Sequence, residues 1–222
     1  MKKDLLEGIF VEEEKTRFSC VVQIGDVREK CYVASSCKLE KLIPLKNKKV
    51  LVKHILSKRS DMKYSLFAVK DQQGWVLLNL ADANRIVEQQ LSERRFSYLG
   101  KRKVVEREKQ IEGYKSDLFL PESNTLIEVK TILSDKKESK FPSVESSRIH
   151  KQLIEILKLL EEGYRVCYLF IALNSITKQV EIEKNLKEIF SKCIDRGMVC
   201  KGYTIKFVDE EPVLHSPVKV II

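Results

Sequence analysis

The chain has 222 residues, of which 43% are hydrophobic and 33% are charged, and its formal net charge is +9 at pH 7. This composition excludes an intrinsically disordered chain and suffices for one large hydrophobic core or two small ones. Six cysteines without a Cys-x-x-Cys pair, and only three histidines, argue against a zinc centre and for free thiols in a reducing cytoplasm. The longest apolar run, residues 166–173, is too short to span a bilayer, so we expect a soluble cytoplasmic protein without a membrane partner.

The first 70 residues predict a small β-barrel. Short alternating runs at residues 8–11, 16–24, 29–34, 49–55 and 64–69 are typical of closely spaced strands. We expect a barrel of the oligonucleotide/oligosaccharide-binding (OB) type. This fold commonly binds nucleic acid through a basic face with stacking aromatic rings.

Positive charge is concentrated in this N-terminal part. Residues 1–70 carry 16 Lys and Arg against 9 Asp and Glu, which accounts for +7 of the total +9. A basic surface attracts polyanions, although lysine-rich loops can also keep a small β-domain soluble and protect its edges. We favour nucleic-acid contacts and Tyr32, Tyr64 and Phe67 as stacking rings, and the basic candidates are Lys46, Lys48, Lys49, Lys53, Lys58 and Arg59.

After an expected linker at residues 71–74, the pattern is that of a mixed α/β domain. Asn79 or Asp82 is available to cap the first helix. The apolar tail at 218–222 is expected as an edge strand, with a strand internal to the sheet or one shared with a second subunit as alternatives, so the oligomeric state is open. The expected helices are 81–93, 146–162 and 180–196, the expected strands are 75–78, 101–107, 165–173 and 200–208, and residues 134–142 are expected as a polar loop.

The hairpin predicted at residues 116–130 carries the candidate chemistry. If Leu120 faces Thr125 across its loop, Asp117 stands opposite Glu128, and Lys130 projects from the same sheet face. Two carboxylates about 4 Å apart repel by roughly 4 kcal/mol at an effective dielectric constant of about 20. A bound divalent cation would reverse that repulsion.

Oxygen ligands favour Mg²⁺, with Mn²⁺ as an alternative. In this interpretation Asp117 and Glu128 hold the metal, the metal acidifies a water, and Lys130 orients that water or offsets charge on a phosphorane. Glu106 on the preceding strand is a candidate third carboxylate, or else a solvent-facing residue paired with Arg107 or Lys109. The alternative for the whole cluster is a solvated hairpin face with surface ion pairs.

The order helix, three strands, helix, strand, with an aspartate on the second strand and Glu-x-Lys on the third, resembles the core of PD-(D/E)XK nucleases. More narrowly, the chain resembles the sugar fermentation stimulation protein (SfsA) family along almost its whole length. The matching positions are Arg17-Phe18, Asn79 and Asn84 with Ile86, the acidic and lysine positions Glu106, Asp117, Glu128 and Lys130, and Phe141-Pro142 followed by Arg148 and Lys151.

The resemblance implies an α+β two-domain fold, with an OB-like domain at residues 1–72 and a restriction-endonuclease-like α/β domain with a mixed sheet at 73–222. It implies DNA binding of low sequence specificity and a nuclease activity, for which we expect Mg²⁺ as the cofactor. The sequence leaves RNA open as another partner. The rival hypothesis is a non-enzymatic DNA-binding regulator of sugar-utilisation genes. The resemblance also adds Arg17 to the candidate nucleic-acid contacts. Arg148 and Lys151 are weaker candidates for contacting the scissile phosphate.

Three features depart from the family pattern. The family's Pro-Asn-Thr-Gly turn is Ala-Ser-Ser-Cys at residues 34–37, and serine rather than proline precedes Asp117. Gln152 stands where the family usually has histidine, which weakens the expected contribution of that helix to the site.

Overall fold

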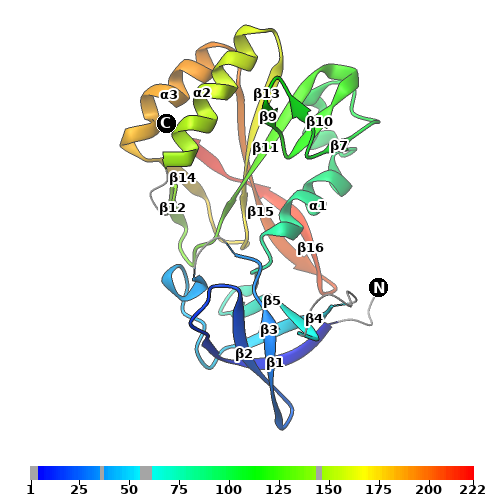
Figure 1. Cartoon of the computed structure of the whole chain (residues 1–222), viewed down its shortest axis with the longest axis vertical. Helices are drawn as coiled ribbons and strands as arrows, with labels where there is room; N and C mark the ends of the chain where they lie inside the picture. Colours follow the sequence, from blue (N-terminus) through cyan, green and yellow to red (C-terminus); the bar gives the residue numbers. More distant parts are fainter. Residues whose placement is uncertain (1–4, 36–37, 56–61, 144–146) are drawn as a thin grey trace.

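The computed structural model describes residues 5–35, 38–55, 62–143 and 147–222 (Figure 1). The chain forms an N-terminal barrel, at the bottom of the view, and a larger C-terminal α/β domain above it. Within the described ranges, no helix is both long enough and apolar enough to cross a membrane.

The N-terminal sheet has the strand order β3-β2-β1-β4-β5-β6, and a parallel pairing of β3 with β5 closes the first five strands into a barrel. Inward-facing residues such as Phe10, Val22 and Val52 are completely buried. The five predicted strands and the OB-like barrel are therefore confirmed. The strands are β1 (Leu5–Glu13), β2 (Ser19–Ile24), β3 (Val27–Tyr32), β4 (Lys49–His54), β5 (Tyr64–Asp71) and β6 (Gly74–Leu77), and a short 3-10 helix (Leu39–Lys41) follows β3.

The expected linker at residues 71–74 is instead the turn of the β5–β6 hairpin. Asp71 pairs with Gly74 across this turn, so the barrel sheet continues to Leu77. The polar sequence Asp-Gln-Gln-Gly suits a tight turn as well as a linker, and sequence alone does not separate the two. Since the Leu77 N–H donates to the Leu173 carbonyl at 2.8 Å, β6 also contacts the second sheet.

The C-terminal sheet has the order β16-β15-β13-β11-β10-β7. Its three central strands run parallel, and the strands outside them are antiparallel to their neighbours. This mixed sheet with its flanking helices is the predicted restriction-endonuclease-like α/β architecture. Its elements are β7 (Glu106–Arg107), β10 (Leu118–Leu120), β11 (Thr125–Ile132), β13 (Arg165–Ala172), β15 (Val199–Val208), β16 (Glu211–Pro217), α1 (Ala81–Gln90), α2 (Ser147–Glu161) and α3 (Lys184–Asp195).

A third, three-stranded sheet accounts for two errors of prediction. It consists of β12 (Glu138–Phe141), β14 (Gln179–Ile182) and β17 (Lys219–Ile221), in that order and all parallel. The helix predicted over 180–196 begins only at Lys184, because Val180 and Ile182 alternate with half-buried neighbours and are buried as strand residues. The predicted loop at 134–142 contains β12, and the apolar tail forms the edge strand β17.

The connection from α1 to the hairpin also differs from the prediction. Residues Arg94–Leu99 form a 3-10 helix, and the strand predicted over 101–107 shortens to β7. A small hairpin follows, made of β8 (Gln110–Ile111) and β9 (Tyr114–Lys115). The N-cap position of α1 is occupied by Leu80, not by Asn79 or Asp82.

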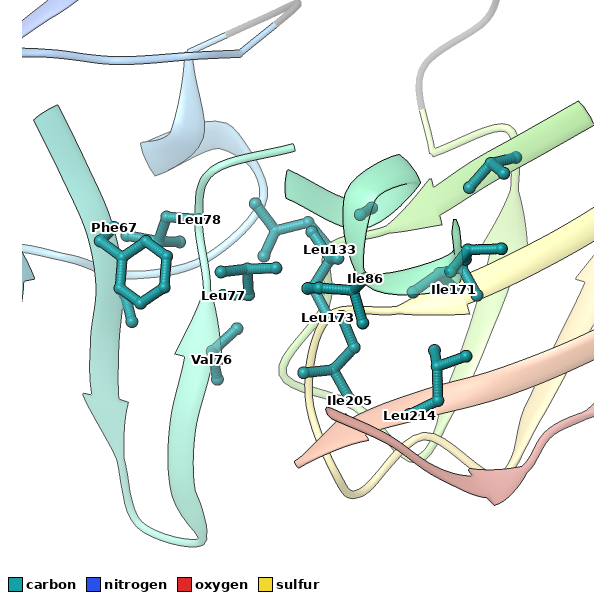
Figure 2. Packing of buried hydrophobic residues seen from close by; sticks show 14 of the residues in the cluster. Phe67, Val76, Leu77, Leu78, Ile86, Leu133, Ile171, Leu173, Ile205 and Leu214 are labelled. Atoms are coloured by element: carbon teal, nitrogen blue, oxygen red, sulfur yellow. The ribbon is translucent and has the colours of Figure 1, made fainter. Parts of the chain in front are cut away.

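One hydrophobic core runs from the barrel into the C-terminal domain (Figure 2). Leu77 of the barrel sheet, Ile86 of α1 and Ile205 of β15 all belong to it and are at most 4% exposed. A second core on the opposite face of the C-terminal sheet holds α2 and α3, with Leu153 and Phe190 completely buried. The sheet that carries the hairpin is therefore covered on both faces.

Candidate active site

The antiparallel pairing of β10 with β11 places the two candidate carboxylates together. Leu120 pairs with Thr125, and counting back along both strands makes Asp117 and Glu128 the next opposed pair beyond the paired segment. A 3-10 turn connects the strands, and Asn124 ends it with φ 48°, a left-handed conformation that asparagine tolerates better than most residues. The register predicted from the sequence is confirmed.

The alternation of side chains decides which sheet face carries the site. Phe119 and Leu126 belong to the core beneath α2 and α3. Asp117 lies two residues from Phe119, and Glu128 and Lys130 lie two and four residues from Leu126, so all three project toward that same face. The site therefore lies beside α2, at the edge of the second core.

Glu128 is the buried centre of the site, with only 4% of its surface exposed. The Tyr114 hydroxyl donates to Oε2 at 2.6 Å, and Lys130 Nζ and Gln152 Nε2 donate to Oε1 at 2.5 and 3.2 Å. Lys130 also donates to Gln152 Oε1 at 2.9 Å, and its ammonium lies 5.7 Å from the Tyr168 ring centroid. The ammonium thus offsets a charge that would be costly to bury alone.

Asp117 is held by one backbone and one side-chain donor. The Val129 N–H donates to Oδ2 at 2.8 Å, and Asn84 Nδ2 donates to Oδ1 at 3.1 Å. Burial, and next the nearby Glu128 carboxylate, raise the pKa of Asp117 above its ordinary value, although these donors and Lys130 act in the opposite direction. The two carboxylates therefore repel each other in a partly buried environment, where water screens their charges less than in bulk solvent.

Tyr114 reaches the site from the β8–β9 hairpin. Glu112 and Gly113 form its two-residue turn, with φ 45° and 84°, and Tyr114 is 7% exposed. Burial and the Glu128 carboxylate raise the pKa of the Tyr114 hydroxyl, so it stays protonated and donates. The only local signal for this hairpin is Gly113 between two apolar residues, and glutamate is not among the residues preferred at the first turn position, so the hairpin was not predicted.

The two flanking helices each contribute one amide. Asn84 comes from α1 and Gln152 from α2, and neither was predicted to contact the carboxylates. Gln152 touches both Glu128 and Lys130, so the departure from the family's histidine does not remove the contribution of α2. A single side chain 20 or more residues from the hairpin carries no local pattern that would reveal such a contact.

Glu106 is not brought into the pair. It pairs with Phe119 in the β7–β10 ladder, and its Oε2 lies 2.7 Å from Lys109 Nζ, as the alternative for this residue anticipated. Over the described part of the chain, no cluster of three or more His, Cys, Asp or Glu side chains is placed to hold a metal ion. The protein would therefore supply two carboxylates, Asp117 and Glu128.

The oxygens of that pair fit a hard divalent cation. Glu128 Oε1 accepts two hydrogen bonds, whereas Glu128 Oε2 and each Asp117 oxygen accept one from the described residues and keep a further lone pair. Mg²⁺ and Ca²⁺ prefer such ligands, and Mg²⁺ often takes only one or two protein carboxylates. A cation would also relieve the repulsion that raises the Asp117 pKa.

The predicted nucleic-acid-binding residues occupy several environments. Lys48 is 3.1 Å from Asp71, Lys49 is 3.8 Å from Glu7, and Lys53 Nζ lies 5.8 Å from the Phe67 ring centroid. Two further residues, Lys58 and Arg59, lie outside the described ranges. The exposed remainder consists of Lys46, Arg17, whose guanidinium lies 4.7 Å from the Phe18 ring centroid, and Arg148 and Lys151 on the first turns of α2.

The barrel and the mixed sheet with its hairpin define the class of the protein. It is a two-domain protein with an OB-like domain and a restriction-endonuclease-like domain. The family model described as sugar fermentation stimulation protein RE domain matches residues 81–211, which is more than half of the chain. The chain therefore belongs to the sugar fermentation stimulation protein (SfsA) family.

Similar proteins support this assignment along the whole chain. A sugar fermentation stimulation protein homolog of Thermotoga neapolitana is 28% identical over 214 residues, covering 95% of this chain and 91% of that protein. A homolog of Desulforamulus reducens is 25% identical and covers 88% and 82%. The solved structure of Pyrococcus furiosus SfsA in complex with Ca²⁺ aligns with a TM-score of 0.85 over 99% of this chain and 97% of that one, and at 16% identity it shows the shared fold.

The raised Asp117 pKa predicts how stability depends on pH. The folded state binds the Asp117 proton more tightly than the unfolded chain, so the ionised side chain lowers stability above the raised pKa. That cost disappears as the pH falls toward the ordinary carboxyl value. In EDTA, Asp117→Asn should raise the free energy of unfolding on the order of 1 kcal/mol at about pH 7 and by much less at about pH 4.

Urea unfolding at the two pH values measures this difference. Asp195→Asn, which changes an exposed acid on α3, is the matched control and should have little effect at either pH. A loss of stability in Asp117→Asn at neutral pH would show that the two carboxylates do not repel each other as described.

Proposed function

We propose that the protein is a metal-dependent phosphodiester hydrolase acting on nucleic acid. The observation that carries the proposal is the opposed pair Asp117 and Glu128, with the Lys130 ammonium 2.5 Å from the Glu128 carboxylate. Surface ion pairs are usually solvated, whereas Glu128 is buried among three donors. Buried charged side chains that hydrogen-bond to one another are more typical of a functional site than of a solvated hairpin face.

The proposed cation is Mg²⁺, with Mn²⁺ as a substitute. Asp117 and Glu128 would hold it, and it would supply Lewis acidity toward a phosphate oxygen and a water of lowered pKa. The Pyrococcus furiosus SfsA structure is a complex with Ca²⁺, an ion that takes the same type of oxygen ligand. A relative that binds a divalent cation supports the proposal that this chain binds one too.

The chain's own residues would position the reacting groups. Lys130 is the candidate to orient the attacking water or to offset the charge that develops on the phosphate. Gln152 donates to Glu128 and accepts from Lys130, so it fixes the ammonium next to the carboxylate. Arg148 and Lys151 are exposed on the same helix as Gln152, and they are the weaker candidates for contacting the scissile phosphate.

The barrel is the proposed grip on nucleic acid, with DNA favoured over RNA. Arg17, Lys46 and Lys49 are exposed basic residues of the OB-like domain, and Arg17 stacks against the exposed ring of Phe18. Backbone phosphates would be contacted without sequence preference. This division gives binding to the N-terminal barrel and chemistry to the C-terminal α/β domain.

The second candidate function is a non-enzymatic DNA-binding regulator of sugar-utilisation genes. Two observations favour it: Lys130 is already paired with Glu128, and Glu106 does not join the carboxylate pair. In that case the nuclease-like domain would be a scaffold. DNA binding would persist, and no metal-dependent cleavage would accompany it.

Plasmid nicking distinguishes the two candidates. The wild-type protein should nick DNA with Mg²⁺ or Mn²⁺ and not with EDTA, and Asp117→Asn or Lys130→Met should lower the rate more than about 100-fold. Their DNA affinity should stay nearly unchanged, because neither residue belongs to the proposed barrel contacts. Asp195→Asn is the control.

Binding without nicking by the wild-type protein would favour the regulator. Equal nicking by the wild-type protein and both variants would point to a contaminating nuclease or another site, and would refute the assignment of these residues.

The salt dependence of DNA affinity tests the barrel contacts. Substituting Arg17, Lys46 and Lys49 together with glutamine should flatten the slope of log affinity against log salt by up to about 3, because each lost phosphate contact removes nearly one released counterion. A control variant, Lys158→Gln with Lys192→Gln, removes two positive charges from exposed lysines paired with acids on α2 and α3. Equal slopes in the two variants would contradict a basic grip on the barrel.

A further inference from the structure

The two oxygens of the Glu128 carboxylate are not equally available to a cation. Oε1 accepts hydrogen bonds from Lys130 Nζ at 2.5 Å and from Gln152 Nε2 at 3.2 Å. Oε2 accepts one bond from the described residues, from the Tyr114 hydroxyl at 2.6 Å. Because a carboxylate oxygen has about two acceptor positions, both positions of Oε1 are filled and one position of Oε2 remains.

Asp117 is not restricted in this way. Its Oδ1 accepts from Asn84 and its Oδ2 accepts from the Val129 N–H, so each oxygen keeps one acceptor position toward the described residues. Asp117 can therefore offer a cation either oxygen or both, whereas Glu128 can offer only Oε2. The restriction on Glu128 comes from the two donors that fill Oε1.

Gln152 is the donor to Oε1 that carries no charge, and its position is well fixed. It lies on α2 beside Leu153 and four residues before Ile156, which are both at most 1% exposed and anchor this part of the helix in the second core. Its Oε1 accepts from Lys130 at 2.9 Å, so turning the amide round would place its NH₂ group against the ammonium. The Nε2 donor is therefore directed at Glu128.

Divalent cations differ in how they use a carboxylate. Ca²⁺ takes about six to eight oxygen ligands and often binds both oxygens of one carboxylate. Mg²⁺ requires a near-ideal octahedron, keeps several waters and is commonly bound through one or two carboxylates. A glutamate with a single available oxygen therefore suits Mg²⁺ and denies Ca²⁺ a ligand that it commonly uses.

We propose that Gln152 is a specificity-determining residue that favours Mg²⁺ over Ca²⁺ at the Asp117–Glu128 pair. By filling the second acceptor position of Oε1, it limits Glu128 to coordination through one oxygen. This inference rests on the metal site of the proposed function and adds an ion preference that the two carboxylates alone would not supply. Tyr114 does not share this role, because its hydroxyl contacts Oε2 and has no effect on the blocked Oε1.

Competition for bound Mn²⁺ tests the proposal on the full chain without nucleic acid. Water-proton relaxation measures the Mn²⁺ bound to the protein, and displacement by Mg²⁺ or Ca²⁺ gives the affinity for each of these ions. Gln152→Met keeps the length of the side chain and removes its amide, so it should raise the affinity for Ca²⁺ relative to Mg²⁺ by about tenfold. Gln152→Ala should shift the ratio in the same direction. Unfolding curves show whether each variant is folded, and if one is not, the other decides.

Tyr114→Phe is the matched control, because it also removes one donor from Glu128 but leaves Oε1 blocked. It should change the affinities for both ions by similar factors and keep the wild-type ratio, and Asp117→Asn should lose most of the Mn²⁺ binding. An unchanged ratio in the folded Gln152 variants, or an equal shift in Tyr114→Phe, overturns this inference and leaves the metal site standing. A wild-type protein that binds no Mn²⁺, or an Asp117→Asn variant that binds it normally, overturns the metal site and this inference together.

Discussion

The register of the β10–β11 hairpin is the constraint on which the rest of the site depends. Pairing Leu120 with Thr125 forces Asp117 and Glu128 to oppose each other, and a slip of one residue would send Glu128 to the other face. The opposed carboxylates repel each other, and burial strengthens that repulsion, so the pKa of Asp117 is raised. Neighbouring hydrogen-bond donors offset this repulsion.

Four side chains donate hydrogen bonds that offset the repulsion between the two carboxylates. The β8–β9 hairpin brings Tyr114, α1 brings Asn84 and α2 brings Gln152, while Lys130 on β11 places an ammonium against Glu128. Each donor stabilises the ionised carboxylates and still leaves lone pairs on both acids. The helix α1 that supplies Asn84 also packs on the barrel-side core through Ile86, so one helix contacts both that core and the candidate site.

The features predicted correctly from the sequence are those that a local pattern of residues determines. The barrel strands alternate with period two, and the hairpin register follows from its own turn, so both were predicted correctly. The prediction extends a helix over β14 because the parallel partners of that strand, β12 and β17, lie about 40 residues away on either side in the chain. The same reason explains why the contacts of Asn84, Tyr114 and Gln152 with the carboxylates were not predicted. Tertiary packing, and not a local pattern, determines these contacts.

The most direct measurement is a titration of the Asp117 carboxyl group by carboxyl-detected NMR, with and without saturating Mg²⁺. We expect the Asp117 pKa to lie above the ordinary aspartate value without metal and to fall markedly when Mg²⁺ binds. An Asp117 that titrates normally, or whose pKa ignores Mg²⁺, would contradict the pairing of two repelling carboxylates around a cation.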